Sequence, residues 1–283
     1  MDGRSDGERR LVRRFFFGSG APLGALLLLS LSPRVAAAPP AVSIGIVPPY
    51  VEKVVAGASS VSDSIAFLNR GTDPVVVSVD LADFGVDPAG AVSEQPPGSQ
   101  PASLVPYLRI TPASVRVAPS QEVFFRYAVE TPPAFKQLRA MIYFSSRPEV
   151  PARPNQVVVV ARMGVPMYVE SRDAKPASLL VEDVRWARTG EAGDSLTLEM
   201  RASNEGERNI RPTGYVLVRS SDGKFDRSYA FNEGREPVLP GQKRQWGMSF
   251  GPVPAGDVTV RLRFATSPRT SYETKTWIPA TGG

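Results

Sequence analysis

The side chains that could do chemistry in this chain are carboxylates, hydroxyls, lysines and arginines, because none of its 283 residues is histidine or cysteine. That absence removes the commonest general base, the thiol nucleophile and the preferred ligands of transition metals. A carboxylate pair or a Ser–Lys pair could still catalyse hydrolysis, but the acidic residues are scattered singly along the chain. The sequence therefore predicts a protein that is not an enzyme and that has no cofactor and no metal.

Two patterns that carry chemistry elsewhere have simpler structural explanations here. The triplet "DFG" at residues 83–85 binds magnesium in protein kinases, but neither a glycine-rich nucleotide loop nor a catalytic loop accompanies it. We interpret it as the end of a strand that runs into a turn. The three tryptophans, Trp186, Trp246 and Trp277, could form a platform for stacking sugars, but their apolar neighbours favour packing in the core or at a domain interface.

The elements that position these residues are all predicted to be β-strands. Apolar residues never keep the helical i, i+3, i+4 spacing for longer than a turn or two, whereas short alternating or β-branched runs bounded by Gly, Pro, Asn and Asp recur throughout. The predicted fold class is all-β, with two tandem immunoglobulin-like β-sandwich domains of about seven strands each. The predicted strands are residues 42–47, 62–69, 75–82, 108–111, 122–130, 138–145 and 156–169, followed by 178–186, 195–203, 213–219, 225–232, 243–250, 258–264 and 272–278.

A weak similarity between two sequence segments supports the prediction that the two halves have the same fold. The segments "FLNRGTDPVVV" and "ASNEGERNIRP" place Asn69 and Asn204 at the end of a strand, each followed by a glycine and then a proline. Asn and Gly tolerate the left-handed backbone of tight turns, so we expect the same hairpin in both halves. A further hairpin is predicted at Asp222 and Gly223, between the strands at 213–219 and 225–232.

The chain begins like an exported precursor. Four arginines between residues 9 and 14 precede an apolar stretch at 15–31 and three alanines at 36–38, so residues 1–37 are predicted to be a signal peptide cleaved after Ala37. Its core, "ALLLLSLS", is too short to span a bilayer, and no integral membrane segment is predicted in the mature chain. The "RRFFF" run leaves ordinary secretion and twin-arginine export both open.

Removing residues 1–37 also changes the charge balance. Six of the 33 Lys/Arg and three of the 28 Asp/Glu lie there, so the formal net charge falls from +5 to +2. No basic stripe or aromatic RNA-binding motif remains, and nucleic acid is not a predicted partner. The rest of the chain suits two domains of about 100–130 residues. We predict them at 38–171 and 172–283, joined through the polar segment "SRDAKP" at 171–176.

The strand predicted at 156–169 is ambiguous. It contains four consecutive valines at 157–160, followed by Arg162. Such a run does not alternate, so it fits a buried central strand, with Arg162 extending to solvent, as well as an edge offered to another chain. Two proline-rich segments, 90–103 and 146–155, are predicted surface loops, and the second directly precedes this strand.

The first half of the chain resembles a known family. The asparagine-ended strand at 62–69, the "PASVR" segment at 112–116, "FFRY" at 124–127 and the long final strand occur in the order found in periplasmic pilus-assembly chaperones. The resemblance covers residues 42–171, and the two-domain layout extends it to the end of the chain. It implies two immunoglobulin-like domains, the first of which lends its last strand to a pilin subunit that lacks one of its own.

The resemblance also implies site residues. Val157, Val159, Arg162 and Met163 are expected to contact the partner by strand addition. Arg162 matches the family's basic anchor for the subunit's terminal carboxylate, which an arginine can hold bidentately. The family's first-strand arginine has no counterpart; Lys53, the nearest basic residue, comes several positions later. The acidic-arginine-acidic triplet before the sixth strand is also missing from "FKQLRAMIYF".

The leading hypothesis is thus a periplasmic chaperone-like protein. Its expected partner is a pilin-like or other secreted subunit, with an outer-membrane usher as a second candidate. The alternative is a structural envelope or adhesion scaffold whose tandem sandwiches bind without lending a strand. A carbohydrate-active β-sandwich is a third hypothesis, but it lacks a convincing acid pair.

Overall fold

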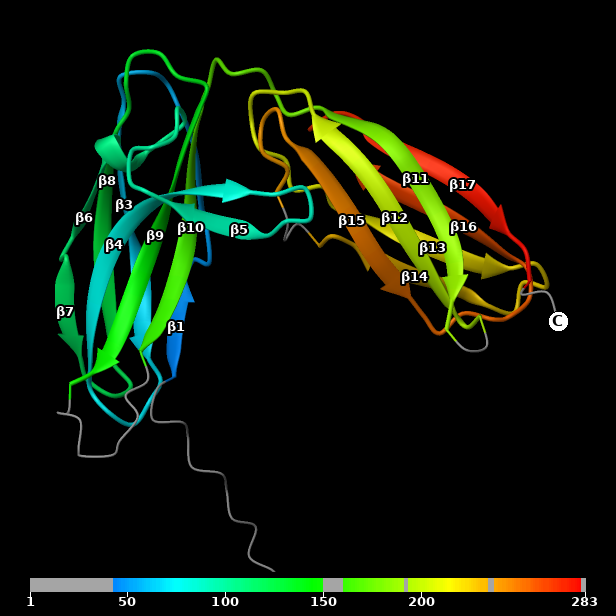
Figure 1. The fold of residues 1–283 in the computed structure, drawn as a ribbon, viewed down its shortest axis with the longest axis horizontal. Helices are drawn as coiled ribbons and strands as arrows, with labels where there is room; N and C mark the ends of the chain where they lie inside the picture. Colours follow the sequence, from blue (N-terminus) through cyan, green and yellow to red (C-terminus); the bar gives the residue numbers. More distant parts are fainter. Residues whose placement is uncertain (1–42, 150–159, 191–192, 234–236, 281–283) are drawn as a thin grey trace, which may run out of the picture. The chain divides into compact units, whose positions relative to one another are not determined.

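The computed structural model describes residues 43–149, 160–190, 193–233 and 237–280, and these residues form two β-sandwiches (Figure 1). The only helix among them is a single 3-10 turn, η1, at Val105–Tyr107. No helix in this part of the chain has the length and hydropathy to cross a membrane. The predicted all-β class is confirmed, whereas the predicted signal peptide at 1–37 lies outside the described residues.

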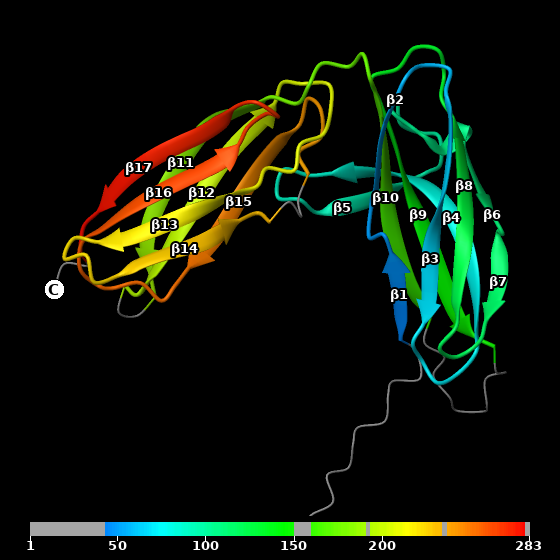
Figure 2. The ribbon, with the colours of Figure 1, turned by 180° about the vertical axis from the view of Figure 1, so that it is seen from behind.

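Ten strands make up the described part of the first sandwich. They are β1 Ile44–Val47, β2 Val51–Val55, β3 Ser60–Asn69, β4 Val75–Val86, β5 Val92–Gln95, β6 Leu108–Thr111, β7 Ser114–Val117, β8 Glu122–Glu130, β9 Gln137–Pro148 and β10 Ala161–Ser171. One sheet has the order β1–β3–β8–β6. The other has the order β2–β10–β9–β4, with β5 and β7 each pairing with β4 (Figures 1 and 2).

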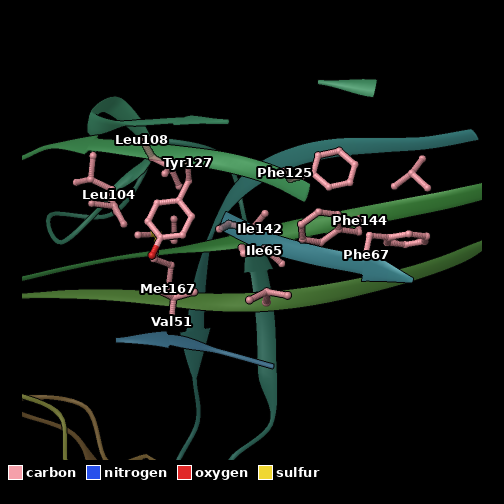
Figure 3. Close-up of a cluster of buried hydrophobic side chains, with 14 of the residues drawn as sticks. Val51, Ile65, Phe67, Leu104, Leu108, Phe125, Tyr127, Ile142, Phe144 and Met167 are labelled. Atoms are coloured by element: carbon pink, nitrogen blue, oxygen red, sulfur yellow. The ribbon is translucent and has the colours of Figure 1, made fainter. Parts of the chain in front are cut away.

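The core of the first sandwich follows from the alternation of its strands. In β8 and β10, every second residue points inward, and Phe125, Tyr127, Val165 and Met167 are at most 2% exposed. Phe125 meets Phe144 of the facing sheet edge to face, with ring centroids 5.1 Å apart. Figure 3 shows Phe125, Tyr127, Phe144 and Met167 between the two sheets. Burial of this apolar surface is the main force that holds the sheets together.

The second sandwich has seven described strands. They are β11 Leu179–Thr189, β12 Ser195–Asn204, β13 Gly214–Ser220, β14 Asp226–Phe231, β15 Lys243–Phe250, β16 Val258–Ala265 and β17 Ser271–Ile278. One sheet has the order β11–β12–β15 and the other has the order β14–β13–β16–β17. The predicted hairpin at Asp222 and Gly223 is confirmed, because β13 pairs with β14 and Gly223 has a φ of 71°. The predicted joint at 171–176 falls between the end of β10 and the start of β11.

Asn69 and Asn204 make equivalent hydrogen bonds, so the two similar sequence segments have the same local structure. Each side-chain amide nitrogen donates to the carbonyl oxygen four residues ahead and to a carbonyl before a later strand, Val117 in one sandwich and Val238 in the other. Each side-chain oxygen accepts from the backbone N–H two residues ahead. The prediction of a hairpin is wrong, however, because β3 and β4 belong to different sheets, as do β12 and β13. The asparagine fixes the corner where the chain crosses between sheets.

Two short strands, β2 and β5, were not predicted, and a third, β7, is the short strand of four residues that ends just before Pro119. β2 follows two prolines and Tyr50, and β5 lies within the segment predicted as the loop 90–103. Each is paired along one side of a longer strand, so it forms through that neighbour rather than through a strong pattern of its own.

The interpretation of "DFG" as the end of a strand that runs into a turn is confirmed, because β4 ends at Val86 and a turn follows at residues 88–89. Asp83 lies inside β4, where it is 1% exposed and accepts hydrogen bonds from the Ser103 hydroxyl (2.6 Å) and the Gln100 N–H (2.8 Å). Its role is to hold the following loop on the sheet.

The three tryptophans differ in their burial. Trp246 is buried in the core of the second sandwich, and Trp186 packs against the same core, as predicted. The prediction of a packing role is wrong for Trp277, which is 62% exposed.

Candidate functional site

The first half of β10 has an open edge. Along one side, β10 pairs antiparallel with β9 from Ala161 to Glu170. Along the other side, the parallel partner β2 reaches only Met167–Ser171 (Figure 2). Among the described residues, no strand pairs with the outer side of the segment 161–166. This segment is where the first sandwich can accept another strand.

The backbone groups at this edge follow from the pairing of β10. The Ser171 N–H donates to the Lys136 carbonyl on the β9 side, and the Arg172 N–H donates to the Val55 carbonyl on the β2 side. Since backbone groups alternate in direction along a strand, the N–H and C=O groups of Arg162 and Gly164 point to the open edge. Pro166 shares this orientation, so its missing N–H takes nothing from the ladder with β9.

The side chains at this edge are partly apolar. Val165, Met167 and Val169 point into the core and are at most 1% exposed. Met163 continues the same inward-facing row, yet it is 40% exposed. An apolar side chain of the inward-facing row is therefore left partly exposed at this end of β10, although its partner on β9, Phe144, is fully buried. Val160, just before the strand, is 58% exposed.

Arg162 lies on the outer face of the sheet, where its guanidinium binds the carboxylate of Glu94, a residue of the same chain. Its Nη1 and Nη2 donate to the two oxygens of Glu94, at 2.6 and 2.9 Å. The guanidinium carbon lies 3.5 Å from the centre of the Tyr143 ring, a cation–π contact. The hydrogen bond from Arg162 lowers the pKa of Glu94 below its ordinary value, and the bond to Glu94 raises the pKa of Arg162.

Gly164 makes room for this arrangement. A Cβ atom at this position would lie 2.8 Å from the Met141 sulfur and 3.1 Å from a ring carbon of Tyr143. The bare backbone thus lets two β9 side chains lie across β10, and the Tyr143 ring supports Arg162.

The structure does not bring Lys53 to Arg162. Lys53 is paired with Val169, near the opposite end of β10, and its ammonium binds Asp63 of β3 at 2.9 Å. This hydrogen bond raises the pKa of Lys53 and lowers that of Asp63. Lys53 shares the inward side of its sheet with Val51, whereas Arg162 points outward. Val157 and Val159, the other predicted contacts, lie outside the described residues.

Glu94 and Tyr143 were not predicted as site residues. Glu94 lies 68 positions from Arg162 in a segment that reads as a loop, so only the sheet topology connects them. Within the described part of the chain, no group of three or more acidic side chains could hold a metal ion.

Comparison with known proteins gives likeness in structure alone. The chain matches no protein-family model and no curated protein. The solved class 5 fimbriae chaperone CfaA matches with a TM-score of 0.44 at 11% identity, covering 84% of this chain and 100% of that one. The E. coli chaperone DraB matches with a TM-score of 0.40 at 17% identity, covering 82% of this chain and 98% of that one.

A third match is the CsuC–CsuE chaperone–tip adhesion subunit pre-assembly complex from archaic chaperone-usher Csu pili of Acinetobacter baumannii. Its TM-score is 0.42 at 10% identity, and the match covers 82% of this chain and 97% of that one. The chain thus matches solved pilus chaperones over most of its length, as the resemblance predicted. At these scores the likeness assigns no role to any residue.

Proposed function

We propose that this protein is a periplasmic chaperone that binds an incomplete secreted subunit, of the pilin kind, by strand addition along the first half of β10. One observation carries the proposal: Ala161–Pro166 lacks a partner strand on its outer side among the described residues, while the inward-facing Met163 is 40% exposed there. A subunit strand would complete the ladder and cover this side chain.

Binding by strand addition requires both main-chain hydrogen bonds and the burial of apolar surface. Arg162 and Gly164 offer two N–H and two C=O groups to an added strand, and each main-chain bond contributes only about 0.5–1.5 kcal/mol net. Apolar burial must supply the rest, since it contributes about 25 cal/mol per Å2. Val160 and Met163 offer such surface, and we assign the same role to Val157 and Val159.

We further propose that Arg162 anchors the subunit's terminal carboxylate. The bidentate bond to Glu94 on the outer face of the sheet supports this role, because it is the geometry in which a guanidinium holds a carboxylate. A subunit carboxylate would have to replace that of Glu94. Lys53 is a weaker candidate, because Asp63 holds its ammonium elsewhere.

The test is co-expression of the full chain with a small secreted subunit encoded beside it, followed by mass spectrometry of the intact complex. Met163→Asp places a charge where the partly exposed apolar side chain of Met163 would be covered by the subunit, and we expect the yield of complex to fall at least about tenfold. Leu180→Asp is the matched control, because Leu180 is an exposed apolar residue on β11 of the second sandwich.

Equal loss of complex in both variants, or in neither, would contradict the strand-addition site. A chain that binds no subunit at all would favour a scaffold protein. Arg162→Gln tests the anchor separately: an unchanged yield would remove the role assigned to Arg162 and leave the open edge standing.

A further inference from the structure

The outer face of the sheet β14–β13–β16–β17 carries an exposed tryptophan beside basic side chains. Along β17, Tyr272 and Ile278 face the core, so the odd-numbered residues, including Lys275 and Trp277, face outward. Across the strands, Thr259 is paired with Trp277, and Arg261 with Lys275. A shallow hollow of about 170 Å3 lies on this surface. We call the surface the Trp277 face; it comprises Trp277 and the lining of the hollow, Leu217, Arg219, Thr259, Arg261 and Lys275.

The charges on the Trp277 face are not balanced. Arg261 and Lys275 have the same sign and lie directly opposite each other, an arrangement that destabilises a sheet. Arg219 is already paired with Asp226, and the Glu273 carboxylate is shared between Arg261 and Arg263 at 3.6 and 3.8 Å. Lys275 has no ion pair with any described residue. An anionic group bound between Arg261 and Lys275 would relieve their repulsion.

The apolar part of this surface is one exposed indole ring and the half-buried Leu217, rather than a broad patch. A stable protein–protein interface buries about 800 Å2 on each partner around an apolar centre. The other exposed large apolar side chain of the described second sandwich, Leu180, belongs to the opposite sheet. A single flat ring suits stacking against the C–H face of a sugar, and the Thr259 hydroxyl opposite can bond to sugar hydroxyls.

We propose that the Trp277 face binds an anionic polysaccharide, with Trp277 stacking on a sugar ring and Arg261 and Lys275 holding the carboxylate of a uronate unit. Such a surface would attach the protein to an acidic glycan of the cell envelope. The inference concerns the second sandwich alone and does not depend on strand addition by β10.

The test measures binding of the full chain to polygalacturonate by calorimetry and by Trp fluorescence. We expect Trp277→Ala and Lys275→Glu each to weaken binding about five- to tenfold, and Trp277→Tyr to retain most of it because the ring can still stack. Arg126→Glu is the charge-matched control: Arg126 is exposed on β8 of the first sandwich, and this change should have little effect. Circular dichroism verifies that each variant is folded.

Poly-glutamate of equal charge distinguishes a glycan from an acidic protein. Weaker binding of poly-glutamate, unchanged by Trp277→Ala, supports the proposal. Equal affinity for both polymers would identify the surface as a site for acidic proteins and overturn it. Polygalacturonate that fails to bind, or that binds Trp277→Ala as tightly as the unaltered chain, would also overturn it.

Discussion

The last strands of the two sandwiches, β10 along its first half and β17 along its whole length, have an open side among the described residues, yet they present different surfaces. Each pairs along one side with its neighbour, β9 or β16. The open half of β10 exposes Met163, next to the exposed Val160, and its arginine is held by Glu94. On β17, no described strand pairs with the outer side at any point, but Glu273 and Lys275 are exposed along it.

The difference shows which edge is suited to accept a strand. Charged side chains on an edge strand discourage pairing with another chain, whereas an apolar edge invites it. The second sandwich thus protects its last strand, and the first does not. Because the asparagine corners are the same in both, the contrast is a property of the strands rather than of two unrelated folds.

The largest expected effect is a loss of stability at the two asparagine corners. It tests whether the corners stabilise the two sandwiches to the same extent. Asn69→Ala removes two donated bonds and one accepted bond from a fully buried corner, and Asn204→Ala removes two donated bonds and two accepted bonds. We expect each change to lower the free energy of unfolding of its own sandwich by about 2–3 kcal/mol, measured by urea denaturation. A loss confined to one of the two variants would break the equivalence.

The next prediction concerns a variant in which the charged residues on the open edge strand β17 are removed. Replacing Glu273 and Lys275 by valine gives β17 an apolar edge, and we expect self-association at micromolar concentration, measured by light scattering after gel filtration. The matched control replaces Glu199 and Arg201 by valine, since these exposed residues have the same spacing on β12, which is paired on both sides. Association of the control to the same extent would attribute the effect to lost charge alone.

A smaller effect concerns the support of Arg162. In Gly164→Ala, the new methyl group would lie 2.8 Å from the flexible Met141 side chain and 3.1 Å from Tyr143. We expect a loss of about 1 kcal/mol in the free energy of unfolding, because Met141 can move while the Tyr143 ring shifts from under Arg162. An unchanged urea midpoint, with an unchanged Tyr143 ring environment by NMR, would contradict the close packing at Gly164.

The smallest effect is a pH dependence. Arg162 lowers the pKa of Glu94 in the folded chain, so the contribution of this pair is fully present above the ordinary carboxyl value of 4.5 and is lost as the pH falls through the lowered value. We expect carbon NMR to place the Glu94 midpoint below 4.5 in the unaltered chain and higher in Arg162→Gln. A midpoint that does not move would show that Arg162 is not the cause.

The sequence predicted the long strands because their alternation survives without any neighbour. The contact between Glu94 and Arg162 could not be predicted, because it depends on β5, β9 and β10 meeting in one sheet. Trp277 was predictable in hindsight: Ser271, Glu273 and Lys275 alternate with less exposed residues, and this pattern places Trp277 on the polar side. Its apolar neighbours in the sequence belong to the opposite face.

Amide hydrogen exchange along β10 in the isolated chain tests the open edge most directly. We expect alternation: the Arg162 and Gly164 N–H groups exchange rapidly, whereas those of Met163 and Val165, which point to β9, are protected. A bound subunit should then protect Arg162 and Gly164 as well. Slow exchange of Arg162 and Gly164 without a subunit would mean that the edge is already covered, and it would contradict the proposed function.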